Sequence, residues 1–242
     1  MPYILALLLF LLVAAPIRAQ SVGDLYQVTL KSGNEYRQAH NEYQLAKNQH
    51  IQYNTAATRT AAIDKTKKVL TGRNKVQSDY LNYLRSYLAE STNIANYTQT
   101  VTYLDLETEI NSLSSYPPTF SGLTTFEGVN SAAKDWESRL KVSGNLAEAS
   151  RMQIVSGKLA GLHAQVSTFV TQYTTSHPEG SSTLDIINQK LQAAESTRLS
   201  VDRDLSSYKS YSWSKSSSVT KLKQSQQLLI EATELLDELN RK

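Results

Sequence analysis

The chain has 242 residues, with 25 Lys and Arg against 22 Asp and Glu, five Pro, nine Gly and no Cys. A chain of this length can bury enough apolar surface to fold without disulfide or metal staples. The lack of Cys excludes a disulfide scaffold, a thiolate metal site and a Cys nucleophile. Because the formal net charge is only +3 and the basic residues are scattered among acidic ones, we expect no nucleic-acid partner.

The first nineteen residues predict an export signal. Residues 3–15 form an uninterrupted apolar run, Pro16 breaks it, and Ala19 places a small residue before Gln20. The run is shorter than the about 20 residues of a membrane-spanning helix. We therefore expect a signal peptide over residues 1–19, cleavage between Ala19 and Gln20, and a secreted or extracytoplasmic protein. The alternative is an N-terminally membrane-anchored protein that contacts the membrane only through this segment, because no Lys or Arg precedes the apolar run.

The rest of the chain predicts long helices. Gly and Pro are absent from residues 73–116 and 181–242, and apolar residues recur there at helical spacing. No alternating strand pattern and no hairpin-turn sequence interrupts this periodicity. The expected fold class is all-α, an elongated antiparallel helical bundle or coiled coil of about four to five long helices.

Residues 20–116 are expected to form a Tyr-rich helical hairpin region. A turn at residues 54–58 would divide it into helices of similar length, and Gly72-Arg73-Asn74 marks the competing break. A further helix is expected over residues 93–113. The paired prolines that follow predict a Pro-containing linker over residues 117–123.

Residues 124–242 are expected to form a long-helix hairpin that continues the bundle of the N-terminal region. Thr124 or Thr125 is a suitable N-cap for the first helix. The apolar stripe of this helix runs through Phe126, Val129, Ala133, Trp136, Leu140, Ala147 and Ile154, and then slips to Val155, Leu159, Leu162, Val166, Phe169 and Tyr173, with Gly157 and Gly161 at the slip. The second helix carries a heptad seam of Leu184, Ile187, Leu191, Ala194, Val201, Leu205, Tyr208, Val219, Leu222, Leu229 and Leu236. Polar residues such as Arg198 fill the other seam positions, and the seam is weakest across residues 206–218.

No pattern in the chain predicts catalysis or metal binding. The four histidines, His40, His50, His163 and His177, have no second ligand at helical metal-site spacing. Glycine-rich phosphate loops and the G-x-S-x-G nucleophile turn are absent from the sequence. We therefore expect a protein that is not an enzyme, with no catalytic residue, no metal site and no cofactor.

Tyrosine is the unusual feature of the composition, because ten of the fourteen tyrosines lie between Tyr26 and Tyr116. Tyrosine buries a large ring while its hydroxyl stays hydrated, so it suits both helix seams and binding surfaces. One interpretation is a Tyr-rich interface between helices of one chain, and the other is a surface for a partner or a glycan. The candidate interaction residues are Tyr36, Tyr43, Tyr80, Tyr83 and Tyr87.

Two stretches carry a resemblance to known proteins. Residues 36–53 (YRQAHNEYQLAKNQHIQY) and 79–91 (DYLNYLRSYLAES) resemble uncharacterised secreted helical proteins of candidate-phylum bacteria. The resemblance implies a bacterial exported protein and assigns no activity.

These patterns together predict an exported, non-enzymatic helical-bundle protein that acts as a structural or protein-binding component of the cell envelope. It would act through a protein partner or through self-association. The alternative is an extracytoplasmic ligand-binding helical module, which needs a pocket between helices.

Overall fold

The computed structural model describes residues 20–177, 182–206, 208–209 and 215–241, and the expected signal peptide lies outside them. In this described part the chain forms helices and no strand, so the all-α class is confirmed. Six of its helices have 19 or more residues, which exceeds the four to five long helices expected. None of the helices described has an apolar stretch sufficient to cross a membrane.

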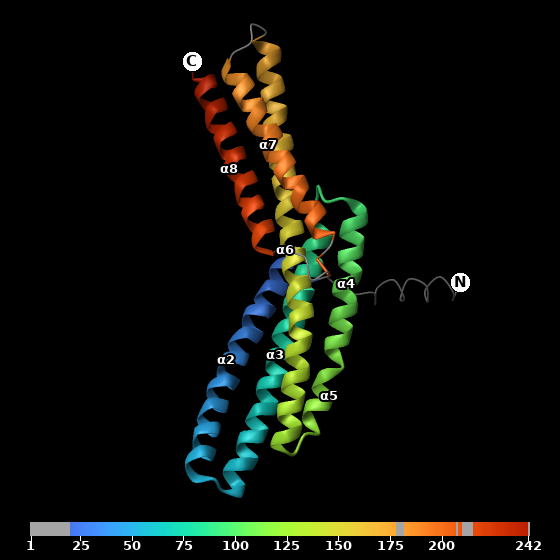
Figure 1. The fold of residues 1–242 in the computed structure, drawn as a ribbon, viewed down its shortest axis with the longest axis vertical. Helices are drawn as coiled ribbons and strands as arrows, with labels where there is room; N and C mark the ends of the chain where they lie inside the picture. The colour runs from blue at the N-terminus through green and yellow to red at the C-terminus, as the bar shows by residue number, and fades with distance from the viewer. Residues whose placement is uncertain (1–19, 178–181, 207, 210–214, 242) are drawn as a thin grey trace, which may run out of the picture.

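The helices build an elongated molecule with one helix shared by both of its ends (Figure 1). In chain order they are α2 (Val22–Tyr53), α3 (Ala56–Glu90), α4 (Asn96–Ser114), α5 (Tyr116–Ser121), α6 (Phe126–Ser176), α7 (Ser182–Leu205) and α8 (Lys215–Asn240). With 51 residues, α6 is about 75 Å long at 1.5 Å per residue. Its first half packs with α3 and α4, and its second half packs with α7 and α8.

A tight turn joins α2 to α3 where the sequence predicted one. Asn54 ends α2 in the left-handed conformation with φ 46°, and its N–H donates to the His50 carbonyl. Thr55 then caps α3 by accepting a hydrogen bond from the Thr58 N–H. The competing break at Gly72 is wrong, because Gly72 lies inside α3.

Small side chains let α2 and α3 pack closely. The buried residues of α2 are Ser32, Ala39 and Ala46, which lie seven residues apart. On α3, a Cβ added at Gly72 would stand 3.6 Å from the Tyr36 Cα. The hairpin is therefore held by close backbone approach rather than by large interdigitating side chains.

The main core is formed by buried residues of α3, α4, α6, α7 and α8. A second cluster of buried residues fills the end of the molecule around α5. It contains Ile63, Leu70, Phe120, Val129 and Trp136. The residues of α5 overlap the expected linker 117–123 and place the Phe120 ring in this cluster. Proline in the first turn is compatible with this short helix, because the N–H groups there have no helical partner.

The C-terminal region contains three helices rather than the two of the expected hairpin. α7 ends at Leu205, α8 begins at Lys215, and the two helices pack against each other. The chain leaves the helix at the start of residues 206–218, where the apolar seam is weakest. The seam residues of α7 are buried as predicted, and Arg198 is buried among them.

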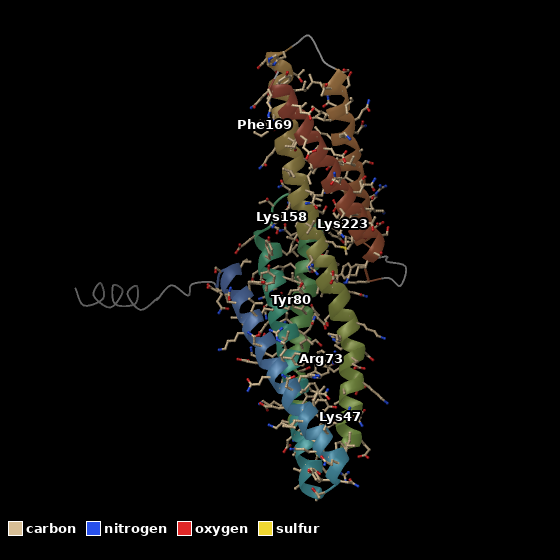
Figure 2. The ribbon with its side chains drawn as sticks, turned by 90° about the vertical axis from the view of Figure 1, so that its left-hand side faces the viewer. Lys47, Arg73, Tyr80, Lys158, Phe169 and Lys223 are labelled. Atoms are coloured by element: carbon tan, nitrogen blue, oxygen red, sulfur yellow. The ribbon has the colours of Figure 1, made fainter. Side chains whose placement is uncertain are left out.

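The core crosses from one side of α6 to the other near the middle of the helix. Buried Ser143 in the first half and buried Leu159 in the second are 16 residues apart, which is a rotation of about 160° at 3.6 residues per turn. Figure 2 shows α2 and α3 on one side of α6 and α7 and α8 on the other. Around the crossing, at residues 146–157, α6 has buried residues on all sides.

The expected stripe in the second half of α6 is wrong at three positions. Val155, Leu162 and Phe169 are exposed, whereas Leu159 and Val166 are buried. The α7–α8 pair covers the side of α6 that carries Leu159, so the stripe through Phe169 faces outward (Figure 2).

Candidate functional site

An open groove lies between α6 and α7. We call it the α6–α7 groove, and its volume is about 1090 Å³. Its floor includes the buried side chains of Val170 and Leu191, and Leu199 lies half-exposed at its edge. Ala95, from the loop between α3 and α4, closes one end.

The two walls of the α6–α7 groove differ in charge. The α6 wall presents His163, Ser167 and Thr171, and residues 159–176 contain no Asp, Glu, Lys or Arg. The α7 wall presents the carboxylates of Glu195 and Asp202 together with Arg203 and uncharged polar residues. A bound segment would therefore meet a neutral wall on one side and a charged wall on the other.

Arg198 lies behind the α7 wall and joins its two carboxylates. It is 7% exposed. Its Nε and Nη2 donate to the two oxygens of Glu195 at 2.8 and 2.6 Å, and its Nη1 donates to Asp202 Oδ2 at 2.7 Å. Ser156 of α6 accepts from Nη1 at 3.1 Å and donates to Asp202 Oδ1 at 2.7 Å. The network ties α7 to α6 and fixes both carboxylates at the groove.

The electrostatics of this network favour ionised groups. Hydrogen bonds from Arg198 hold the pKa of Glu195 below its ordinary value, although burial acts in the opposite direction. The positive charge of Arg198 lowers that pKa further through space. The hydrogen bond to Glu195 in turn raises the pKa of Arg198. One guanidinium between two carboxylates leaves the network with a formal charge of −1.

Two glycines of α6 let the α3–α4 loop lie against the groove end. A Cβ at Gly157 would stand 2.7 Å from both Ile94 Cγ1 and the Thr92 carbonyl oxygen, and one at Gly161 would stand 2.8 Å from Asn93 Nδ2. Asn93 adopts a positive φ of 62° at this contact. Because they have no Cβ, Gly157 and Gly161 thus allow the α3–α4 loop to contact α6 directly.

The α3–α4 loop is also held from α4. Gln99 donates from Nε2 to the Leu88 carbonyl at 2.6 Å and to the Ser91 carbonyl at 3.0 Å. These carbonyls lie at the end of α3, where a helix leaves acceptors without intrahelical partners. The loop that closes the groove is therefore fixed at both of its sides.

A small cavity lies under this loop, and we call it the Gln153 cavity. Its volume is about 30 Å³, and its lining includes Asn93, Thr98, Gln153 and Ser156. Ala95 and Asp202 line both this cavity and the α6–α7 groove, so the two spaces adjoin. Gln153 Nε2 donates to Thr102 Oγ1 at 2.8 Å, whereas the buried Gln153 Oε1 has no hydrogen-bond partner.

Three of the five candidate tyrosines lie together on α3. The rings of Tyr80 and Tyr83 stack with centroids 6.2 Å apart, and those of Tyr83 and Tyr87 are 5.8 Å apart. Tyr26 of α2 extends this row at 5.5 Å from Tyr83, and Lys158 of α6 lies 5.0 Å from the Tyr87 ring centroid. Burial raises the pKa of Tyr80 and of Tyr83, so both hydroxyls stay protonated near neutral pH.

The other two candidates lie apart from this row. Tyr36 and Tyr43 flank the His40 ring on α2, each with its ring centroid 6.0 Å away. All five candidates are partly buried, and Tyr80, Tyr83 and Tyr87 pack against the main core. Both expectations for these residues stay open, because the rings join helices of one chain and also keep exposed surface.

The sequence pointed to Leu191 only as a seam residue and to His163 only as an isolated histidine, and it did not predict the groove that they line. In the sequence, Arg198 stands out only as a polar residue in an apolar seam. No sequence pattern marks Gln153, because its hydrogen-bond partner lies on α4 and its cavity is lined in part by the α3–α4 loop. A buried position occupied by a long cation is the one signal that pointed here. His163 lines the groove, and across the residues with described positions no cluster of three or more His, Cys, Asp or Glu side chains is arranged to hold a metal.

Comparison with other proteins gives no assignment. No protein-family model, no curated protein and no solved structure matches the chain.

Proposed function

We propose that the chain is an exported, non-enzymatic helical-bundle protein that serves as a protein-binding component of the cell envelope. The observation that supports this function is the α6–α7 groove, where we place the segment of a partner. Export is checked by mass spectrometry of the extracytoplasmic protein, which should begin at Gln20. A species beginning at Met1 would favour the anchored form.

The openness and charge of the groove favour a protein segment over a small molecule. Pockets for small molecules have volumes of about 300–1,000 Å³ and enclose most of their ligand. The groove, with a volume of about 1090 Å³, lies near the upper end of this range but is open to solvent rather than enclosed. Its α6 wall lacks charged side chains, which is the composition found in the core of protein interfaces.

The elongated shape supports a structural contribution as well. We propose that α7 and α8 pack as a coiled-coil pair, because the buried residues of α7 from Leu184 to Leu205 follow heptad spacing. A stable rod would hold the groove at a defined distance from the tip of the α2–α3 hairpin.

A ligand-binding helical module is the second candidate function. The Gln153 cavity favours it, because an unpaired buried acceptor beside a carboxylate is a feature of a polar ligand site. In that case a small molecule would fill the cavity and part of the groove without a protein partner.

Site-specific photo-crosslinking tests the proposed function. A photoreactive residue placed at Gln192, which lines the groove, is compared with one at Gln44 on the exposed side of α2. We expect a discrete adduct with an envelope protein from Gln192 and none from Gln44. Thr171→Arg, which narrows the groove, should remove the adduct while the melting temperature stays unchanged. Equal adducts from both positions, or none from Gln192, would contradict a groove-bound partner.

A further inference from the structure

We propose that the Gln153 cavity is an ammonium subsite, and that it receives a lysine side chain of the segment bound in the α6–α7 groove. This inference rests on the proposed function for the origin of the lysine. The ammonium specificity itself follows from the groups around the cavity.

The buried side chain of Gln153 carries an unpaired hydrogen-bond acceptor. Gln153 is 2% exposed, and its Oε1 is buried without a hydrogen-bond partner. Its Nε2 is already engaged with Thr102, which orients the amide and leaves the oxygen as the free end. A buried carbonyl without a donor is unfavourable, so an occupant of the cavity that donates to Gln153 Oε1 would be favoured.

The network beside the cavity carries a net negative charge. Asp202 lines the cavity, and it shares the single guanidinium of Arg198 with Glu195. The three side chains together carry a formal charge of −1 at the boundary between cavity and groove. An occupant with one positive charge neutralises the network, whereas a carboxylate or phosphate would be repelled. A primary ammonium is the group that combines a unit charge with three hydrogen-bond donors.

The cavity is small, and its wall is held in place by the α3–α4 loop. A space of about 15 Å³ is enough for one water, so the 30 Å³ of the Gln153 cavity is large enough for one ammonium group. The wall opposite α7 is fixed, because the loop is seated on Gly157 and Gly161 and held by Gln99. Ala95 and Asp202 mark the side on which the cavity meets the groove, so a lysine stem would enter from there.

Butylammonium, the analogue of a lysine side chain, is the probe for the experiment. Its binding to the full mature chain is followed through the side-chain amide signal of Gln153 by nuclear magnetic resonance, with 1-butanol and butanoate as matched probes. We expect saturable butylammonium binding that shifts the Gln153 amide signal, at least about tenfold weaker binding of butanol, and none of butanoate. This comparison uses the unaltered protein and so does not depend on how any variant folds.

Variants then locate the binding. Asp202→Asn and Gln153→Met should each weaken butylammonium about tenfold, because each removes one charged or neutral acceptor. Ser196→Ala is the matched control, since Ser196 lines the groove but not the cavity, and it should leave the affinity unchanged. Equal binding of butanol and butylammonium, or a Gln153 signal that no probe shifts, would overturn the subsite and assign the cavity to water.

A separate experiment tests whether the ammonium group belongs to a lysine of the partner segment, independently of whether a partner binds in the groove. In the partner segment crosslinked through Gln192, replacement of its groove-bound lysine by methionine should weaken binding about tenfold. An unchanged affinity would overturn the lysine assignment while the groove-bound partner stands. If butylammonium binds but no adduct forms at Gln192, the proposed function fails and the ammonium subsite is retained.

Discussion

Arg198 shows how one side chain can serve both folding and a surface. Its stem occupies a seam position of α7, and its guanidinium reaches the two carboxylates of the groove wall. A buried cation of this kind stabilises only while its partners remain, because an unpaired buried charge is strongly unfavourable.

Removal of this cation should destabilise the protein. Arg198→Met keeps the volume of the stem but leaves Glu195 and Asp202 without their shared partner. Because both carboxylates are partly exposed and regain water, we expect a loss of about 2 kcal/mol in the free energy of unfolding. Urea unfolding measures this loss, and Arg203→Met at an exposed position of the same helix should change stability by less than about 0.5 kcal/mol. An equal effect of the two substitutions would show that the network is not formed.

Two glycines of α6 should respond in opposite directions to alanine. Gly157→Ala places a Cβ 2.7 Å from Ile94 and from the Thr92 carbonyl, so the loop must move, at about 1–3 kcal/mol. Gly144→Ala meets nothing within 4 Å and should stabilise the helix by about 0.5–1 kcal/mol, since alanine is the better helix former. Thermal unfolding of both variants checks the pair. A stable Gly157→Ala protein would mean that the loop does not rest on α6.

At the scale of elements, the heptad seam of α7 should carry much of its stability. Leu205 is 1% exposed at the last position of the helix, and Ser206 beside it is exposed. Leu205→Ala should lower the free energy of unfolding by about 2–4 kcal/mol through lost burial and a residual cavity. Ser206→Ala should change it by less than about 0.5 kcal/mol. Urea titrations that give equal values for the two would indicate that α7 does not pack along this seam.

Acid should weaken the contact between α2 and α3. Hydrogen bonds from Lys65 and Lys68 of α3 lower the pKa of Glu42 on α2 from 4.5 to about 2. Because the folded pKa lies below the unfolded one, this stabilisation is complete above about pH 4.5 and is lost as the pH falls toward 2. Glu42→Gln should therefore reduce the pH dependence of stability in that window, as followed by urea unfolding at pH 6 and pH 3. An unchanged pH dependence would show that the three side chains are not paired in solution.

The sequence correctly predicted the elements in which apolar residues recur at a single regular spacing or in which turn-forming residues stand together. The α7 seam and the turn after Tyr53 were predicted correctly, because heptad spacing and turn-forming residues are local signals. The second half of α6 was not, because apolar residues occur on more than one of its faces. Which face of α6 is buried depends on where α7 and α8 pack, and this is decided by tertiary packing rather than by the local sequence. The groove and the Gln153 cavity lie beyond sequence reasoning for the same reason, since a loop and three helices meet there.

The whole molecule should behave as a rod in solution. A compact globule of 242 residues has a radius of gyration of about 18 Å, whereas a rod with only the 75 Å length of α6 already has about 22 Å. Small-angle X-ray scattering of the protein should therefore give a radius of gyration of at least about 22 Å. A value near that of the globule would show that the two ends fold back on each other.

The crossing of the core along α6 has a mechanical consequence. α6 alone runs through both ends of the molecule, with the α2–α3 hairpin on one side of it and the α7–α8 pair on the other. A pull between the hairpin tip and the far end of α7 would pass along the α6 backbone and load each core in shear. Many side-chain contacts would then resist together, whereas peeling would break them one at a time. We therefore expect the protein to resist tension along its length better than separation of its helices from the side.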